Sequence, residues 1–180
     1  IKFFGALYNK NEQAETIFKT IETNYLDAKK LAQNTINKPR VLSGAMYKDI
    51  WYLPSGTSPE AQLLKDANVN YLWENAESKG SLALNFEVVF DKAKDADIWI
   101  SPSYYNSLEA LEKANKHYTE FDPFKNKQIY SFVNTAGETG GVTYYELGTA
   151  RPDLVLKDLV KIAHPELLEN YELQFFKRLE

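Results

Sequence analysis

Cysteine is absent from this chain of 180 residues, and its absence removes several kinds of chemistry at once. Disulfide bonds, thiolate catalysis and Cys-ligated zinc are all excluded. The only two histidines, His117 and His164, lie far apart in the sequence, which also excludes a His-rich metal site. We therefore predict neither a metal site formed by the protein nor a cofactor.

Positive charge and long apolar runs are also scarce. The chain has 21 Lys and Arg against 25 Asp and Glu, which gives a net charge of −4. Because there is no basic surplus to neutralise phosphates, we expect no nucleic-acid partner. The longest apolar runs are about half a dozen residues, far short of the roughly 20 that a helix needs to cross a bilayer.

Aromatic residues, by contrast, are abundant: the chain has 12 Tyr, 10 Phe and 3 Trp. Apolar residues make up 44% of the chain and charged residues 26%, a balance typical of a folded domain rather than of a disordered tail. The core of such a domain uses some of these rings. We interpret the remaining aromatic residues as part of a surface or cleft that binds a flat or apolar molecule.

The first residues have the spacing of a helix but not its usual start. Ile1, Phe4, Leu7 and Tyr8 follow helical spacing, yet no capping residue precedes them, and these residues do not have the pattern of a signal peptide. We expect that an N-terminal part of the protein precedes this segment and carries part of the functional site.

A long helix is predicted over residues 12–37. Apolar residues recur there at intervals of three and four, and no Pro or Gly interrupts them. Such a helix is on the order of 40 Å long, which suits a rod that joins two lobes. Because Lys38-Pro39 ends it, we divide the chain into a helical segment, residues 1–38, and a C-terminal α/β lobe, residues 39–180.

Short apolar strands alternate with helices in the second segment. Strands are predicted over residues 40–46, 70–73, 97–101 and 128–133, and helices over residues 57–67, 86–93, 107–114, from 151 onward and over 171–179. Residues 51–56 are predicted to form a loop, and residues 135–141, which contain three glycines, a mobile loop. The alternation predicts a three-layer αβα lobe with a mostly parallel sheet of about four or five strands, preceded by the long helix.

Several segments, in this order, resemble the C-terminal lobe of class III periplasmic substrate-binding proteins. The similarity includes a turn over residues 66–70, a helix start at Phe86-Glu87, a strand over residues 95–100, the pair Tyr144-Tyr145 and the run RPDLVLKDLVKIAHPELL. These proteins serve importers of iron–siderophores, haem and cobalamin. In them a single rigid helix joins two lobes, and residues 12–37 correspond to it.

The resemblance implies a binding protein rather than an enzyme. Such a protein captures a metal chelate between two lobes outside the cytoplasm and delivers it to the permease of an ABC importer. The resemblance also implies a periplasmic or cell-surface location, with a lipid anchor on an N-terminal segment. It further implies an N-terminal lobe as the partner of this lobe.

Candidate ligand-binding residues are those expected at strand ends, where crevices form in open α/β sheets. Trp51 and Tyr52 are expected to pack on a flat ligand, with Leu53 and Ser55 in the same loop; the alternative is a core pair beneath the loop. Trp73 follows a strand and is equally well explained as a core residue.

The resemblance adds further candidates. It places ligand contacts near Tyr144 and Tyr145, one facing inward and one outward. Arg151 is a candidate for holding a ligand carboxylate or catecholate, although an ordinary salt bridge explains it as well. Glu87 is a candidate for docking to permease arginines; its place in the first turn of a helix is a sufficient structural reason for a carboxylate.

Other polar residues have structural explanations. Asp95 and Asp97 precede a strand, where Asp commonly forms turn hydrogen bonds, and we assign them no catalytic role. His164 is interpreted as a helix-entry residue, and Glu138 as a solvent-exposed residue of the glycine-rich loop.

The alternative function is that of an α/β enzyme domain, such as a metal-assisted hydrolase or a chelatase-like protein. A hydrolase would need a cluster of carboxylates and histidines at the strand ends, which two distant histidines do not supply. Because aromatic residues dominate the predicted rim and only three Arg are present, a large neutral chelate such as a corrinoid is favoured, with haem and iron–siderophores kept open.

Overall fold

A five-stranded sheet with strand order β4-β1-β6-β7-β8 forms the centre of the lobe. The computed structural model describes residues 1–78, 80–137 and 141–180. Strands β1 (Arg40–Ser43), β4 (Asn70–Tyr71), β6 (Ile98–Ile100) and β7 (Ile129–Ser131) are parallel, whereas β8 (Lys177–Arg178) is antiparallel to β7. The predicted mostly parallel sheet is confirmed.

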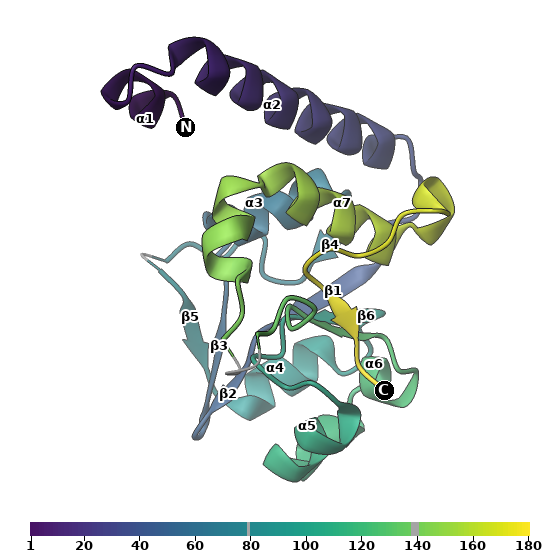
Figure 1. Ribbon diagram of the computed structural model, residues 1–180. Helices are drawn as coiled ribbons and strands as arrows, with labels where there is room; N and C mark the ends of the chain where they lie inside the picture. The colour runs from purple at the N-terminus through teal and green to yellow at the C-terminus, as the bar shows by residue number, and fades with distance from the viewer. Residues whose placement is uncertain (79, 138–140) are drawn as a thin grey trace.

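Helices cover both faces of this sheet, which confirms the predicted three layers (Figure 1). α3 (Pro59–Asp66) and α7 (Pro152–Ala163) lie on one face. α4 (Phe86–Ala93), α5 (Leu108–Ala114) and α6 (Asp122–Lys125) lie on the other. Single-turn helical segments η1 (Lys116–Glu120), η2 (Tyr144–Gly148) and η3 (Pro165–Leu168) complete the connections.

Local sequence explains where three of these helices begin. The side chains of Ser58, Asn85 and Ser107 accept hydrogen bonds from backbone N–H groups in the first turns of α3, α4 and α5. Each such cap satisfies a donor that the helix itself leaves unpaired. α3 and α7 also have a proline at their first position, where its missing N–H costs nothing.

A second, three-stranded antiparallel sheet was not predicted. It consists of β2 (Ala45–Tyr47), β3 (Ile50–Leu53) and β5 (Leu82–Leu84). The strand predicted over residues 40–46 is therefore two strands that belong to different sheets, and the loop predicted over residues 51–56 begins within β3. The chain changes sheet at Gly44, whose φ of +78° favours glycine, and an added Cβ would overlap the carbonyl oxygen of Tyr52.

The predicted long helix is present as α2 (Asn11–Gln33), which follows the short α1 (Lys2–Leu7) and extends past the lobe (Figure 1). Its 23 residues correspond to about 35 Å. It ends at Gln33 rather than near residue 37 because the Asn68 side-chain amide donates to the carbonyl oxygens of Ala32 and Thr35, which fixes the turn after the helix.

Polar contacts fix the second half of α2 to the lobe. The Tyr25 hydroxyl donates to a carboxylate oxygen of Asp66, in α3, at 2.6 Å, and the Lys29 ammonium lies 2.9 Å from the other oxygen. The Asn24 side-chain amide donates to Asp153, in α7, at 3.3 Å. Because α3 and α7 also pack on the sheet, these contacts make α2 a rigid extension of the lobe.

The helix predicted over residues 171–179 is wrong. This segment is mostly extended and ends in β8. The buried carboxylate of Asp158, in α7, accepts hydrogen bonds from the backbone N–H groups of Gln174, Phe175 and Phe176 and from the Tyr171 hydroxyl. The acceptor for these donors, Asp158, lies outside residues 171–179. The sequence pattern of that segment alone therefore does not predict its extended conformation.

Candidate functional site

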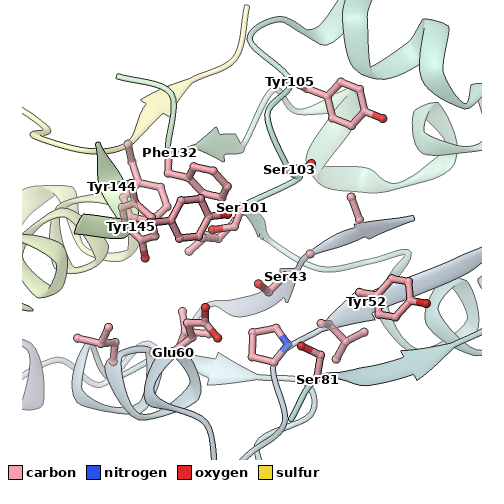
Figure 2. Close-up of a pocket in the computed structure, with 18 of the residues that line it drawn as sticks. Ser43, Tyr52, Glu60, Ser81, Ser101, Ser103, Tyr105, Phe132, Tyr144 and Tyr145 are labelled. Carbon is pink, nitrogen blue, oxygen red and sulfur yellow. The ribbon is translucent and has the colours of Figure 1, made fainter. Parts of the chain in front are cut away.

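A cavity of about 380 Å³ lies at the carboxyl ends of β1 and β6. From β1 the chain continues to β4 on one side of the sheet, and from β6 it continues to β7 on the other. The connections thus leave adjacent strands in opposite directions, which opens a crevice between them. Figure 2 shows the side chains that converge on this crevice from both sheets and from α3 and η2.

Serine residues form much of the polar lining of the cavity. Ser43 is the last residue of β1 and is buried, and Ser101 directly follows β6. Ser101 and Ser103 have φ values of +58° and +66°, which are uncommon for residues with a side chain. The Ser131 hydroxyl donates to the carbonyl oxygen of Ser103 at 2.8 Å, so this unusual turn is held from the neighbouring strand.

Aromatic side chains form one wall of the cavity. Phe132, just after β7, stacks on Tyr144 with the ring centres 5.0 Å apart and the planes inclined by 16°. Tyr145 meets both rings edge-on and is 52% exposed. Tyr144 also contacts Phe175 and Phe176 in the core, so the wall rests on the interior of the lobe and presents Tyr145 to the cavity.

One carboxylate, that of Glu60, lines the described part of the cavity. Glu60 lies in the first turn of α3 and keeps access to solvent, while the surrounding protein removes enough water to raise the pKa of its carboxyl group. Burial likewise raises the pKa of Tyr144 and Tyr145, so both phenols are neutral at physiological pH.

Four of the predicted ligand-binding residues lie together in this cavity: Tyr52, Leu53, Tyr144 and Tyr145. Tyr52 is 45% exposed, whereas Leu53 is buried and contributes mainly to the base of the cavity. As expected for the tyrosine pair, Tyr144 faces the interior and Tyr145 is more exposed. The structure thus groups them; contact with a ligand stays a prediction.

Trp51 does not line the cavity, so the expectation that it packs on a flat ligand is wrong. It belongs to β3, where side chains alternate between the two faces, so its buried ring points away from that of Tyr52. The ring packs against Trp99, Tyr118 and Phe121. The core interpretation was therefore the right one for Trp51.

Ser55 and Trp73 also lie outside the cavity. The Ser55 hydroxyl is buried and pairs with that of Thr57 at 3.3 Å. Trp73 is buried beside Tyr71, with the Lys92 ammonium 5.1 Å from its ring centre. Both residues pack where the loop after β3 meets the turn after β4. The Ser55 hydroxyl and the Trp73 ring therefore point into the protein rather than into the crevice.

Arg151 is engaged by a carboxylate of its own helix start. Its Nε and Nη2 atoms donate to the two oxygens of Asp153 at 2.9 and 2.8 Å, and it does not line the cavity. Burial alone would raise the pKa of Asp153, but the hydrogen bonds from Arg151 and Asn24 outweigh burial and lower it. The structure thus shows the ordinary salt bridge, whereas contact of Arg151 with a ligand carboxylate or catecholate stays a prediction.

The other singled-out residues lie away from the cavity. Glu87 is exposed in the first turn of α4. Asp95 pairs with Arg40, and Asp97 accepts a hydrogen bond from the Arg40 backbone N–H at 2.7 Å, which are structural roles. His164 is buried with its Nε2 3.0 Å from the Ala67 carbonyl oxygen. Glu138 and the rest of residues 138–140 of the glycine-rich loop fall outside the described residues, so the expectation for Glu138 is not addressed.

Sequence reasoning missed part of the lining, notably Ser43, Glu60, Ser101, Tyr105 and Phe132. A signal was available for Ser101 and Phe132, which lie at or next to the last residue of the strands predicted over residues 97–101 and 128–133, whereas Ser43 lies inside the strand predicted over residues 40–46. The strand-end rule was applied instead to Trp51, Tyr52, Leu53, Ser55 and Trp73, and Glu60 was not singled out. Tyr105 has no such signal, because the loop after β6 brings it to the cavity.

Two features are absent from the described residues. Within residues 1–78, 80–137 and 141–180, no three His, Asp or Glu side chains gather as they would around a metal ion. In the same part of the chain, no helix combines the length and apolar character that a bilayer span requires.

Two curated proteins of Methanocaldococcus jannaschii resemble this chain. An uncharacterized lipoprotein is 31% identical over 179 residues, which cover 98% of this chain and 41% of that protein. An uncharacterized protein is 29% identical and is matched over 52% of its length. The chain thus spans about half the length of the curated relatives it matches. No family model matches the chain.

Solved structures with similar folds are periplasmic binding proteins. The TroA-like periplasmic binding protein FepB from Veillonella parvula aligns with 99% of this chain and 60% of its own, with a TM-score of 0.68 and 17% identity. The periplasmic heme-binding protein RhuT from a Roseiflexus species aligns with 92% of this chain and 61% of its own, with a TM-score of 0.67 and 16% identity. At these identities the likeness establishes the fold.

Proposed function

Because the chain has the fold of the C-terminal lobe of class III periplasmic binding proteins, we propose that it is part of the solute-binding component of an ABC importer. It captures a metal chelate outside the cytoplasm and releases it to a permease. The proposal combines the fold with one observation on which it chiefly depends. This observation is the cavity between β1 and β6, where the chain connections leave the sheet in opposite directions.

The lining of the cavity suits binding better than catalysis. It combines aromatic rings with serine hydroxyls, a combination that grips a flat or amphipathic molecule and fixes its orientation. A serine nucleophile needs a base within hydrogen-bonding distance. No hydrogen bond joins the Ser43 or Ser101 hydroxyl to a base in the described part of the chain.

A second lobe completes the site in this proposal. α2 and α1 extend away from the lobe and carry a group of exposed apolar side chains at their free end, including Phe3, Phe4, Leu7 and Tyr8. A patch of this kind is what an interface with another domain buries. Residues 1–38 then form the rod between two lobes, and the greater length of the relatives leaves room for an N-terminal lobe.

The proposed ligand is an iron–siderophore, haem or a cobalamin-like corrinoid. Among the similar structures, RhuT is called a heme-binding protein and IsdE of Staphylococcus aureus was solved in complex with heme; IsdE has a TM-score of 0.60 and 14% identity. The rings of Tyr52, Tyr145 and Phe132 offer the kind of surface on which a macrocycle packs. The metal is part of the cargo.

Delivery to the permease involves a residue outside the cavity in this proposal. Glu87 is exposed in the first turn of α4, where the helix dipole favours a carboxylate, and we assign it the docking contact with permease arginines. Glu87→Lys should then reduce chelate uptake by cells without changing chelate affinity; unchanged uptake would contradict this role. One relative is called a lipoprotein, which fits a location at the outer side of a membrane with a lipid anchor.

Titration tests the proposal directly. The full-length protein is titrated with cobinamide, cobalamin, haemin and ferric siderophores, and the quenching of its Trp and Tyr fluorescence is measured. We expect saturable binding of one chelate class, and a loss of about tenfold or more in Tyr145→Ala, because burying a ring against a ligand contributes roughly 1.5–3 kcal/mol.

Leu147→Ala is the matched control for this titration. Leu147 lies on the same turn as Tyr145 and is 50% exposed, but does not line the cavity. Its substitution should leave affinity unchanged. The proposal fails if none of these chelates binds, or if the two variants lose affinity equally.

A further inference from the structure

Glu60 occupies the boundary between two cavities. The main cavity meets a second one of about 610 Å³, lined by Tyr25 of α2, Thr149 and Val155, and both cavities share Glu60 and Tyr145. Figure 2 shows the Glu60 side chain rising from α3 toward the tyrosines of η2. A ligand large enough to extend from one cavity into the other therefore passes this carboxylate.

The lining gives Glu60 no charged partner. Within the described residues, neither cavity is lined by Lys, Arg or His, and Glu60 forms no ion pair or hydrogen bond. The first turn of α3 tolerates a carboxylate through the helix dipole, but that effect supplies the Glu60 carboxylate with no hydrogen-bond donor from a described side chain. Glu60 is exposed in the free lobe, and a ligand that fills both cavities displaces the water around it, so the carboxylate then gains most from a cation or an N–H group that binds beside it.

The aromatic rings around Glu60 also favour a cation over an anion. The phenol rings of Tyr144 and Tyr145 present electron-rich faces, which attract a cation rather than an anion. A ligand with carboxylates or catecholates at this position would meet a like charge and no compensating donor of opposite charge from the described lining. The lobe is therefore built to discriminate by charge as well as by shape.

We infer that this lobe recognises the cationic or amide-bearing side of a neutral or positively charged chelate, through a hydrogen bond from an ammonium or amide N–H group to Glu60. This inference rests on the proposed function and narrows its ligand class: amide-bearing corrinoids and hydroxamate siderophores with a free amine fit, whereas anionic ferric triscatecholates do not. Glu60 selects the charge, and the aromatic wall supplies the packing.

A matched pair of probes tests the inference on the full-length protein. Ferrioxamine B carries a free ammonium group, and its N-acetylated form has the same iron complex without that charge. Tryptophan fluorescence titration should show the ammonium form binding about tenfold more tightly, the effect of one charge-assisted hydrogen bond. In Glu60→Gln this preference should disappear. Glu109→Gln, which removes a charge on the exposed surface of α5, should keep it.

Cobinamide, haemin and a ferric triscatecholate complete the panel and separate two kinds of failure. If no chelate binds, the proposed function fails and this inference fails with it. If chelates bind but the triscatecholate or haemin is preferred, or if Glu60→Gln leaves the order of affinities unchanged, the inference alone is overturned. Higher affinity for neutral and cationic chelates that is lost in Glu60→Gln supports it.

Discussion

The indole N–H of Trp51 donates a hydrogen bond to the carbonyl oxygen of Ser43 at 3.0 Å. Beside it, the indole N–H of Trp99 donates to the carbonyl oxygen of Gly44 at 2.8 Å, and the two rings pack with their centres 5.4 Å apart. Ser43 and Gly44 line the cavity, whereas both tryptophans lie behind it. Trp51 thus supports the cavity from the core rather than contacting its contents.

Trp51→Phe should show the value of this support. The substitution keeps an aromatic ring in the core but leaves the Ser43 carbonyl without its donor, so we expect a loss of about 1–3 kcal/mol in the free energy of unfolding. Urea denaturation followed by circular dichroism measures the loss. Trp73→Phe is the control, since Trp73 is also buried but forms no comparable hydrogen bond in the described contacts. Equal losses in both variants would contradict a specific role for the Trp51 N–H.

Gly44→Ala should damage the junction between the two sheets. A side chain is strained at the φ of Gly44, and its Cβ would overlap the Tyr52 carbonyl, so a loss of about 3 kcal/mol or more is expected. Chelate affinity should fall as well, because Tyr52 lines the cavity. In Gly141→Ala, where an added Cβ has nothing within 4 Å, the midpoint of thermal unfolding should stay nearly unchanged. A tolerated Gly44→Ala variant would refute the described turn.

Tyr25→Phe tests how firmly α2 is attached. It removes the hydrogen bond to Asp66, a carboxylate that is buried and keeps its ion pair with Lys29. A loss of about 1–2 kcal/mol in unfolding free energy is expected from one hydrogen bond to a charged group. Amide hydrogen exchange should increase in the second half of α2. Tyr8→Phe, which alters an exposed ring at the start of the chain, should change neither quantity.

The raised pKa of Glu60 predicts a pH dependence of stability. The folded state holds the proton of the Glu60 carboxyl group more tightly than the unfolded state does. Protonation of Glu60 therefore stabilises the fold fully at pH values below the pKa of the unfolded state, and this stabilisation is lost as pH rises through the pKa of the folded state. Glu60→Gln should therefore match the unsubstituted protein below about pH 4 and exceed its stability at pH 7. The gain should stay below about 1 kcal/mol, because the carboxylate keeps access to solvent.

Chemical denaturation at a series of pH values checks this dependence. The neighbouring Tyr71, Tyr144 and Tyr145 do not titrate over this range, because burial raises the pKa of each phenol. Glu109→Gln on the exposed face of α5, where Glu109 forms a solvent-exposed ion pair with Lys113, is the reference for a change in net charge away from the cavity. A stability difference for Glu60→Gln that shrinks as pH rises would have the wrong sign.

The proposed second lobe leads to a prediction for the 180-residue chain itself. Alone, it should bind a chelate much more weakly than the full-length polypeptide, by about a hundredfold or more, because half of the contacts are missing and nothing closes over the ligand. Calorimetric titration of both proteins with the same chelate provides the comparison. Equal affinities would show that this lobe holds the whole site.

Much of the lobe was predictable because its signals are local. Ser58 and Pro59 specify the start of α3, Asn85 specifies that of α4, and apolar residues at helical spacing specify α2. The strands of the parallel sheet appear as short buried runs. Each of these features depends on neighbours within a few residues, where backbone capping and amphipathic spacing act.

The site was only partly predictable because it depends on partners far along the chain. By itself the sequence determined the layered α/β lobe, the long helix and the presence of aromatic residues near strand ends. Tertiary structure alone decided that Trp51 faces the core while Tyr52 faces the cavity, because pairing of β3 with β2 and β5 sets which side chains point to each face. It also brought Glu60 beside Tyr144 and Tyr145, since residues more than 80 positions apart meet only when α3 and η2 pack around the same crevice.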